Sequence, residues 1–127
     1  MGTVVLDADV VIGFLAPLDS HHPAAVRQVR PWLAREHRRL IAATTYAEAL
    51  VRPVRSGEMG IVDGFVEHGK VEIVPLDRRL ARKAAELRAR HRTLRLPDAV
   101  TLATALEREA ELLTFDRALR RIERAER

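Results

Sequence analysis

The sequence contains no cysteine, very little lysine and no long apolar run. Without cysteine the chain forms no disulfide and has no thiolate chemistry, which fits a reducing compartment. No apolar run approaches the roughly 18 residues that span a bilayer. The start, Met1-Gly2-Thr3, lacks the basic region and cleavage pattern of a signal peptide. We therefore expect a cytoplasmic protein that does not associate with membranes.

The length and the charge suggest one domain and an anionic partner. The 127 residues, 47% of them hydrophobic, fit a single domain over 1–127. The chain has 22 Lys and Arg against 18 Asp and Glu, and Lys70 and Lys83 are the only lysines. Guanidinium groups suit bidentate contact with phosphate, so a nucleic acid is a reasonable partner, although a modest net charge more often reflects a solvated surface.

The stretch Val4–Leu15, with the sequence VVLDADVVIGFL, organises the chain. Val4–Leu6 is typical of a central strand buried on both faces, and apolar residues then recur at helical spacing until Pro17. Asp7 and Asp9 therefore lie at a strand-to-helix junction, the usual ligand position in open α/β sheets. Asp is also a favoured helix N-cap, which explains this pair equally well.

The rest of the chain alternates between helices and strands. We predict further strands at Leu40–Ala43, Val71–Leu76 and Leu112–Thr114. Helices are predicted over Ala24–Arg39 with a kink or break at Pro31, from Thr44 to about Val51 with a stop near Pro53, over Glu58–His68, from Arg78 to about Arg92, and from Pro97 to Leu106, before a charged segment at Arg117–Arg127. This alternation indicates one parallel sheet covered on both sides.

Four acids are expected at one edge of this sheet, because parallel strands end on the same side. They are Asp7, Glu48, Asp98 and Asp116. Each has a structural explanation, since Glu48 and Thr45 have capping-box spacing, Asp98 falls in a first helical turn and Asp116 can be an N-cap. Clustered carboxylates raise one another's pKa unless a cation neutralises them, so four together are harder to explain by capping.

The available ligands favour a hard cation. The chain has no cysteine and no suitably spaced histidine pair, which argues against zinc, whereas an oxygen-only cluster suits Mg²⁺ or Mn²⁺. Such an ion can activate a bound water for attack on phosphorus.

Four blocks, VVLDADVVIGFL, TTYAEALVRP, LPDAVTLATAL and LLTFDRAL, resemble the acidic blocks of PIN-domain ribonucleases, particularly the VapC toxins of bacterial toxin–antitoxin pairs. The resemblance covers nearly the whole chain in the family's order and spacing. It implies a three-layer α/β/α sandwich around four to five parallel strands. It also implies a metal-dependent endoribonuclease that inhibits translation and growth when it is released from its antitoxin.

The resemblance assigns roles to single residues. The metal and catalytic acids match Asp7, Glu48, Asp98 and Asp116. Thr114 matches a hydroxyl residue two positions before the last acid. Asp9 stands where many relatives have Ser, Thr or Asn, and we expect it to support the site. Many relatives add a short strand where this chain ends, so we expect the fifth strand to be absent here or replaced by a helix.

The expected partners are RNA, with tRNA or rRNA as candidates, a VapB-type antitoxin and a second copy of the chain. Arg52, Arg95 and Arg117 are the first arginines to consider for RNA, although solvated surface charge is the simpler explanation for each. A solvated loop is likewise the simpler explanation for His21 and His22. Apolar surface for a protein partner is expected on Ala24–Arg39 and Met59–Val66, where core packing is the default explanation.

Two other functions fit parts of the sequence. DADV resembles the opening motif of haloacid-dehalogenase phosphatases, with Asp7 as nucleophile and Asp9 as acid and base, but neither Lys70 nor Lys83 lies in a convincing later motif. A receiver-like module could bind Mg²⁺ at the acidic edge without catalysis. It would need a lysine after a late strand, and LLTFD supplies only Thr114.

Overall fold

A computed structural model describes all residues 1–127. Its sheet has four parallel strands in the order β3-β2-β1-β4. The strands are β1 (Thr3–Leu6), β2 (Arg38–Ala42), β3 (Val71–Val74) and β4 (Glu111–Leu113). The chain continues after β4 into a helix, so the sheet has no fifth strand.

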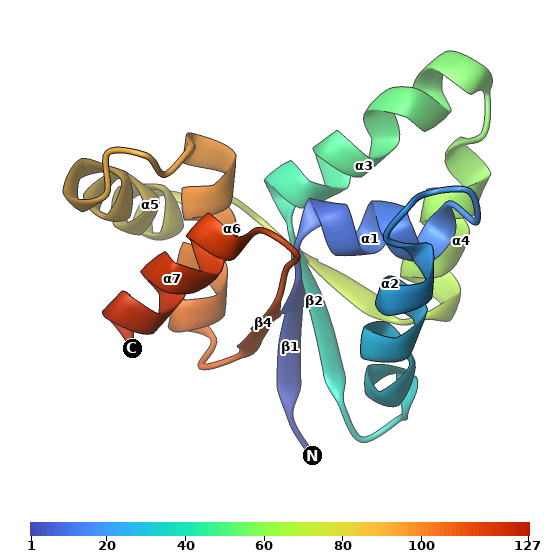
Figure 1. The fold of residues 1–127 in the computed structure, drawn as a ribbon, viewed down its shortest axis with the longest axis horizontal. Coiled ribbons are helices and arrows are strands. Elements are labelled where there is room, and N and C mark those ends of the chain that lie inside the picture. Colours follow the sequence, from blue (N-terminus) through green and yellow to red (C-terminus); the bar gives the residue numbers. More distant parts are fainter.

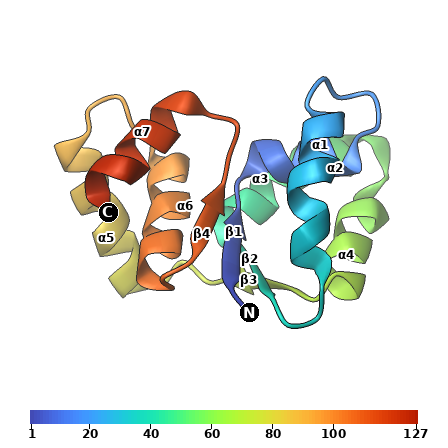
Figure 2. The same ribbon diagram turned by 60° about the horizontal axis from the view of Figure 1, so that its bottom comes forward.

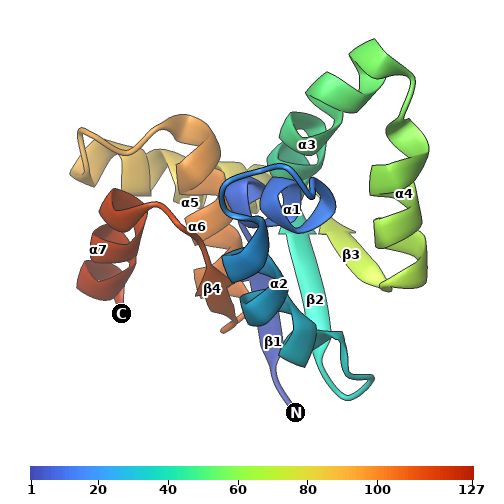
Figure 3. The same ribbon diagram turned by 45° about the vertical axis from the view of Figure 1, so that its right-hand side comes forward.

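Helices cover both faces of the sheet (Figures 1, 2 and 3). On one side lie α1 (Ala8–Leu15), α2 (His22–Val29), α3 (Ala43–Ser56) and α4 (Met59–His68). On the other lie α5 (Arg78–Arg90), α6 (Leu96–Glu107) and α7 (Arg117–Glu126). None of the helices has both the length and the apolar character needed to cross a membrane. The predicted three-layer arrangement is confirmed.

The strands are buried on both faces, and their residues alternate between two apolar clusters. Val4, Leu6 and Ile41 belong to the cluster beneath α1–α4. Val5 and Leu40 belong to the cluster beneath α5–α7. A shift of one residue would exchange the two sets, so this packing fixes the register and with it the place where each strand ends.

The predicted break of the segment Ala24–Arg39 at Pro31 is found, but the prediction that the segment remains helical up to Arg39 is wrong. The α-helix ends at Val29, a short 3₁₀ helix, η1, spans Arg30–Leu33, and Arg38 already belongs to β2. Pro31 lacks the backbone N–H that a continuing α-helix needs, so the helix divides there. The apolar spacing continues past this break and is misleading on its own.

The predicted stop near Pro53 is also wrong, because α3 continues to Ser56. Pro53 removes one backbone hydrogen bond close to the end of the helix, where few bonds remain to be lost. The true stop is Gly57, whose φ of 75° is a left-handed C-cap and whose N–H bonds to the Pro53 carbonyl.

Smaller differences shift the ends of other elements. The α6 helix begins at Leu96, which makes Pro97 its second residue, and β3 ends at Val74 rather than Leu76. The second and fourth strands each begin earlier in the chain than predicted, at Arg38 and Glu111. The charged segment after Asp116 is the helix α7.

Arg39 is a buried cation that is held by backbone carbonyls. It is 7% exposed, and its Nε donates to the carbonyl of Gly69 at 2.7 Å. Its Nη1 donates to the carbonyls of Trp32, Ala34 and His37 at 2.7, 3.0 and 3.0 Å. One side chain therefore ties the connection before β2 and the turn before β3 to the middle of the sheet.

We predict that Arg39→Leu lowers the free energy of unfolding by about 3 kcal/mol, because several buried carbonyls lose their donor. Urea unfolding measures the effect. Arg38→Leu is the matched control, since Arg38 is exposed and pairs with exposed Glu72 at 2.9 Å. The control should change stability by no more than about 1 kcal/mol. Equal losses in the two variants would contradict this role of Arg39.

Candidate active site

The predicted acids come from four elements that meet at the carboxyl edge of the sheet. Asp7 directly follows β1, and Asp116 follows β4 and precedes α7. Glu48 lies in the second turn of α3, and Asp98 lies in the first turn of α6. In Figure 1, β1, β2 and β4 end toward the edge where α1 and α3 begin. The topology thus brings together residues that are far apart in the chain.

Asp7 is the most enclosed of these acids, at 6% exposure. Its Oδ1 accepts the Ala8 N–H at 2.9 Å and caps α1, and its Oδ2 accepts the Thr114 hydroxyl at 2.7 Å. Burial raises the pKa of Asp7, the two hydrogen bonds oppose this, and the charges of Asp98 and Asp116 raise it further. Asp7 is therefore both a helix cap and a member of a carboxylate cluster.

Thr114 connects two of the acids through one buried hydroxyl. Its Oγ1 donates to Asp7 and accepts the backbone N–H of Asp116 at 3.0 Å. Asp116 in turn caps α7, because its Oδ1 accepts the N–H groups of Ala118 and Leu119 at 2.9 and 3.1 Å. The position of β1 and the start of α7 are thereby fixed to each other.

Asp9 holds the backbone between Thr114 and Asp116. Its Oδ2 accepts the N–H of Phe115 at 3.0 Å, while its Oδ1 is buried without a hydrogen-bond partner. Burial and the nearby charge of Asp7 raise the pKa of Asp9 to about 6. This geometry agrees with a supporting role for Asp9.

Phe115 was not identified as part of this site from the sequence, and neither was its contact with His21. Their rings stack with centroids 4.5 Å apart and an interplanar angle of 26°. The stack depends on Gly13, because a side chain there would approach the Cβ of His21 to 3.2 Å. His21 therefore packs one side of its ring, while about half of its side chain, 51%, remains exposed in the turn before α2. The position of Phe115 between Thr114 and Asp116 was the one sequence feature that could have identified it as part of the site.

Asp98 is 8% exposed and shares its charge with a nearby arginine. Arg95 Nε donates to Asp98 Oδ2 at 3.2 Å. The charge of Asp98 and this hydrogen bond raise the pKa of Arg95, and the charges of Glu48 and Asp116 add to the effect. Arg95 therefore faces several acids of the edge, while most of its own side chain remains in solvent.

Glu48 is exposed at the edge of the cluster. Desolvation and the charges of Asp7 and Asp98 raise its pKa, and Arg95 opposes this. The capping-box explanation is wrong, because α3 begins at Ala43 and Thr45 lies inside it. Glu48 thus has no structural role at the helix end.

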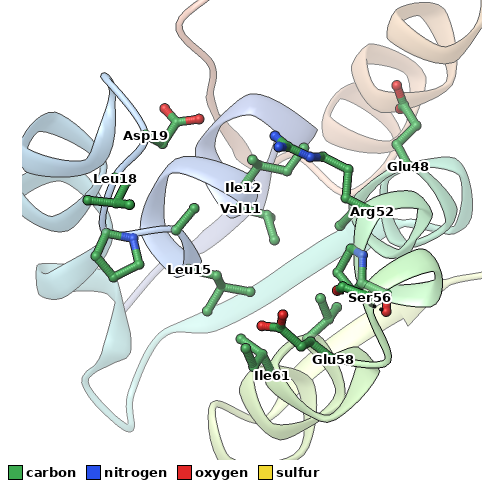
Figure 4. A pocket seen from close by; sticks show the side chains of 15 residues that line it. Val11, Ile12, Leu15, Leu18, Asp19, Glu48, Arg52, Ser56, Glu58 and Ile61 are labelled. Carbon is green, nitrogen blue, oxygen red and sulfur yellow. Dashed lines mark hydrogen bonds between the residues drawn. The ribbon is translucent and has the colours of Figure 1, made fainter.

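An open pocket of about 720 Å³ adjoins Glu48, between α1, α3 and α4. Its lining includes Leu15, Leu18 and Ile61, and Arg52 reaches from α3 across it toward α1 (Figure 4). Arg117, the third arginine considered for RNA, is exposed in the first turn of α7, next to Asp116.

The carboxylates fit a divalent cation in their chemistry. Their donor atoms are all oxygens, which Mg²⁺ and Mn²⁺ prefer. Mutual repulsion contributes to the raised pKa of Asp7, Asp9 and Glu48, and the buried Oδ1 of Asp9 has no donor. In this conformation, however, no three acidic or histidine side chains are grouped as metal ligands. The predicted donor set is present, and its ligand geometry is not assembled.

A family model described as PIN domain matches residues 4–125. The search of curated proteins finds no match. The fold is similar to that of Mycobacterium tuberculosis VapC20, a Sarcin-Ricin loop cleaving toxin, with TM-score 0.73, 15% identity, and 93% of each chain covered.

Two further structures share the fold. One is a toxin-antitoxin complex from Klebsiella pneumoniae, with TM-score 0.70 and 22% identity, covering 89% of this chain and 86% of that one. The other is VapBC2 from Rickettsia felis bound to a DNA fragment from their promoter, with TM-score 0.72 and 14% identity, covering 94% and 92%.

We predict that, in EDTA, the free energy of unfolding falls as the pH rises from about 4 to about 7. The pKa of Asp9 is about 6 in the fold against an ordinary 3.8, so the folded state binds this proton more tightly. That stability is present at low pH and is lost as Asp9 ionises.

Asp9→Asn keeps an acceptor for the Phe115 N–H but cannot ionise. The variant should therefore lose about 1 to 2 kcal/mol less unfolding free energy than the wild type over this pH range. This value is reduced for the partial exposure of Asp9. Urea unfolding across a pH series measures it. Asp77→Asn is the matched control, because Asp77 caps α5 outside the cluster. A pH dependence in Asp9→Asn equal to that of the wild type would contradict the prediction.

Proposed function

The chain belongs to the PIN domain family, and on this basis we propose that it is a metal-dependent endoribonuclease. The observation that carries the proposal is the Thr114 hydroxyl that links Asp7 to Asp116. The charges of Asp98 and Asp116 both raise the pKa of Asp7, so the three acids act on one another across the same edge. Such a cluster is suited to a cation and a phosphodiester.

In this proposal Asp7, Asp98 and Asp116 would hold Mg²⁺ or Mn²⁺, and Glu48 would bind directly, through water or through a second ion. When bound, the ion supplies Lewis-acid activation of water and offsets negative charge on the phosphate. Glu48 is the exposed acid with a raised pKa, which suits it to accept a proton from the attacking water. The expected products carry 5′-phosphate and 3′-hydroxyl ends.

The surrounding residues position these acids. Thr114 orients Asp7, and Asp9 holds the Phe115 N–H and so the segment that carries Asp116. Arg95 offsets the charge of Asp98 and presents a largely exposed guanidinium to an incoming phosphate. The phosphatase alternative is disfavoured, because the family model that matches the chain is that of the PIN domain.

We predict that Asp7→Asn and Asp98→Asn each reduce cleavage of total cellular RNA by at least about a hundredfold. Both remain folded, because each loses repulsion from the neighbouring acids, and Asn at position 7 can still cap α1. Cleavage is measured with Mg²⁺, with Mn²⁺ and with EDTA, and the ends of the fragments are mapped.

Asp77→Asn, in which the cap of α5 changes in the same way outside the site, should retain wild-type cleavage. Full activity in Asp7→Asn would overturn the assignment of the acids. No cleavage by folded wild-type protein free of any partner would favour a non-catalytic metal-binding module.

We further propose that the chain is the toxin of a toxin–antitoxin pair, that it cleaves tRNA or rRNA and inhibits growth, and that it forms a homodimer. The open pocket beside Glu48 suits an apolar segment of a VapB-type antitoxin, since the exposed apolar side chains of Leu18 and Ile61 line it. A segment bound there would lie next to Glu48 and Arg52, and would block access to the site.

We predict that induced expression of the chain in bacteria arrests growth and that its antitoxin prevents the arrest. Ile61→Asp should remain toxic and resist the antitoxin, because it places a charge in the apolar lining. Leu76→Asp is the matched control, an exposed apolar residue outside the pocket. Growth curves with and without the antitoxin measure the difference. Neutralisation of Ile61→Asp as effective as that of the wild type would place the partner elsewhere.

A further inference from the structure

The helix α7 separates its acidic and basic side chains onto different faces. Glu123 is 6% exposed, and Glu126 packs toward the end of α5. Both acids are paired within the fold: Glu123 with Arg120 and Arg127, and Glu126 with Arg90 and His91. The acids of α7 are therefore neutralised on its inner side and leave the charge of its outer side uncompensated.

Three arginines form that outer side. Arg117, Arg121 and Arg124 are exposed and make no ion pair. Their spacing of four and then three residues places them on one face of the helix. We call these three residues the arginine row.

Two members of the arginine row, Arg117 and Arg121, do not serve the stability of α7, whereas Arg124 lies in the last turn, where the helix dipole favours a cation. Arg117 occupies the first position of the helix, where the helix dipole disfavours a cation. Arg117 and Arg121 are like charges four residues apart, which is also destabilising. Arg117 and Arg121 thus oppose folding, and all three arginines lack an acidic partner, which suits them to an anionic ligand.

The position and length of the row match a nucleic acid strand that leaves the site along α7. The row begins next to Asp116, and α7 runs outward from the end of β4 to the C-terminus (Figure 1). At a rise of 1.5 Å per residue, Arg117 to Arg124 spans about 10 Å. A stacked strand carries one phosphate per roughly 3.4 Å, so the row can meet about three phosphates.

We propose that the arginine row binds the phosphate backbone of the RNA strand as it leaves the candidate active site along α7. This inference rests on the proposed ribonuclease function and adds to it the path of the substrate. The contacts are to phosphate and therefore independent of base sequence.

The test compares two triple variants of the full chain. One changes Arg117, Arg121 and Arg124 to Gln. The matched control changes Arg27, Arg30 and Arg35 to Gln, three exposed arginines without ion pairs on and after α2, across the sheet. Both variants lose the same formal charge, and thermal unfolding verifies that both remain folded.

Binding of an oligouridylate is measured by fluorescence anisotropy in EDTA over a series of NaCl concentrations. For three lost phosphate contacts on a single strand, the slope of log affinity against log salt should become shallower by about 2. The control should keep the wild-type slope. With Mg²⁺ or Mn²⁺, the arginine-row variant should show a raised KM and a retained kcat.

The outcomes separate the two proposals. If the wild type cleaves RNA and the salt slope is unchanged in both triple variants, or becomes equally shallow in both, the arginine row is not the path of the RNA strand. The ribonuclease function then stands. A weaker affinity with an unchanged slope would equally overturn the row. If the folded wild type neither binds nor cleaves RNA, the proposed function fails and the row fails with it.

Discussion

The hydrogen bond from Thr114 to Asp7 is the contact on which the candidate site depends. It joins residues 107 positions apart, and its donor oxygen also accepts the N–H of Asp116. The parallel register makes it available, because Leu6 pairs with Leu113 and the Asp7 N–H bonds to the Leu113 carbonyl at 2.9 Å. The hydrophobic packing of β1 and β4 therefore determines the geometry of the acids.

The same edge concentrates negative charge that the fold only partly compensates. Backbone N–H groups at the starts of α1 and α7 bind Asp7 and Asp116, and Arg95 binds Asp98. These donors lower the cost of ionisation, yet the pKa values of Asp7 and Glu48 remain raised. The residual repulsion is a cost to stability in the absence of a cation. An aspartate that caps a helix thus stabilises the fold and is also positioned to bind a ligand.

The sequence was informative where local pattern and topology agree. The positions of Asp7, Asp98 and Asp116 followed from the rule that parallel strands end at one edge, and the structure places them there. The two prolines show where local pattern is insufficient. Pro31 divides a helix, whereas Pro53 does not, because it lies close to the end of α3. The contacts of Arg39 and the stacking of His21 on Phe115 join distant segments, and no periodicity encodes them.

Charge distribution explains how an acidic site can belong to a protein suited to a polyanion. The net charge of +4 is an average over an acidic edge and basic surroundings. RNA approaching the carboxylates alone would be repelled, and exposed arginines close to the edge counter this repulsion over about a Debye length. Arg95 acts within the cluster, whereas Arg117 stands at its border, where the helix dipole gives it no stabilisation. Under the proposed function, recognition of an anion accounts for Arg117, whereas Arg95 also offsets the charge of Asp98 within the fold.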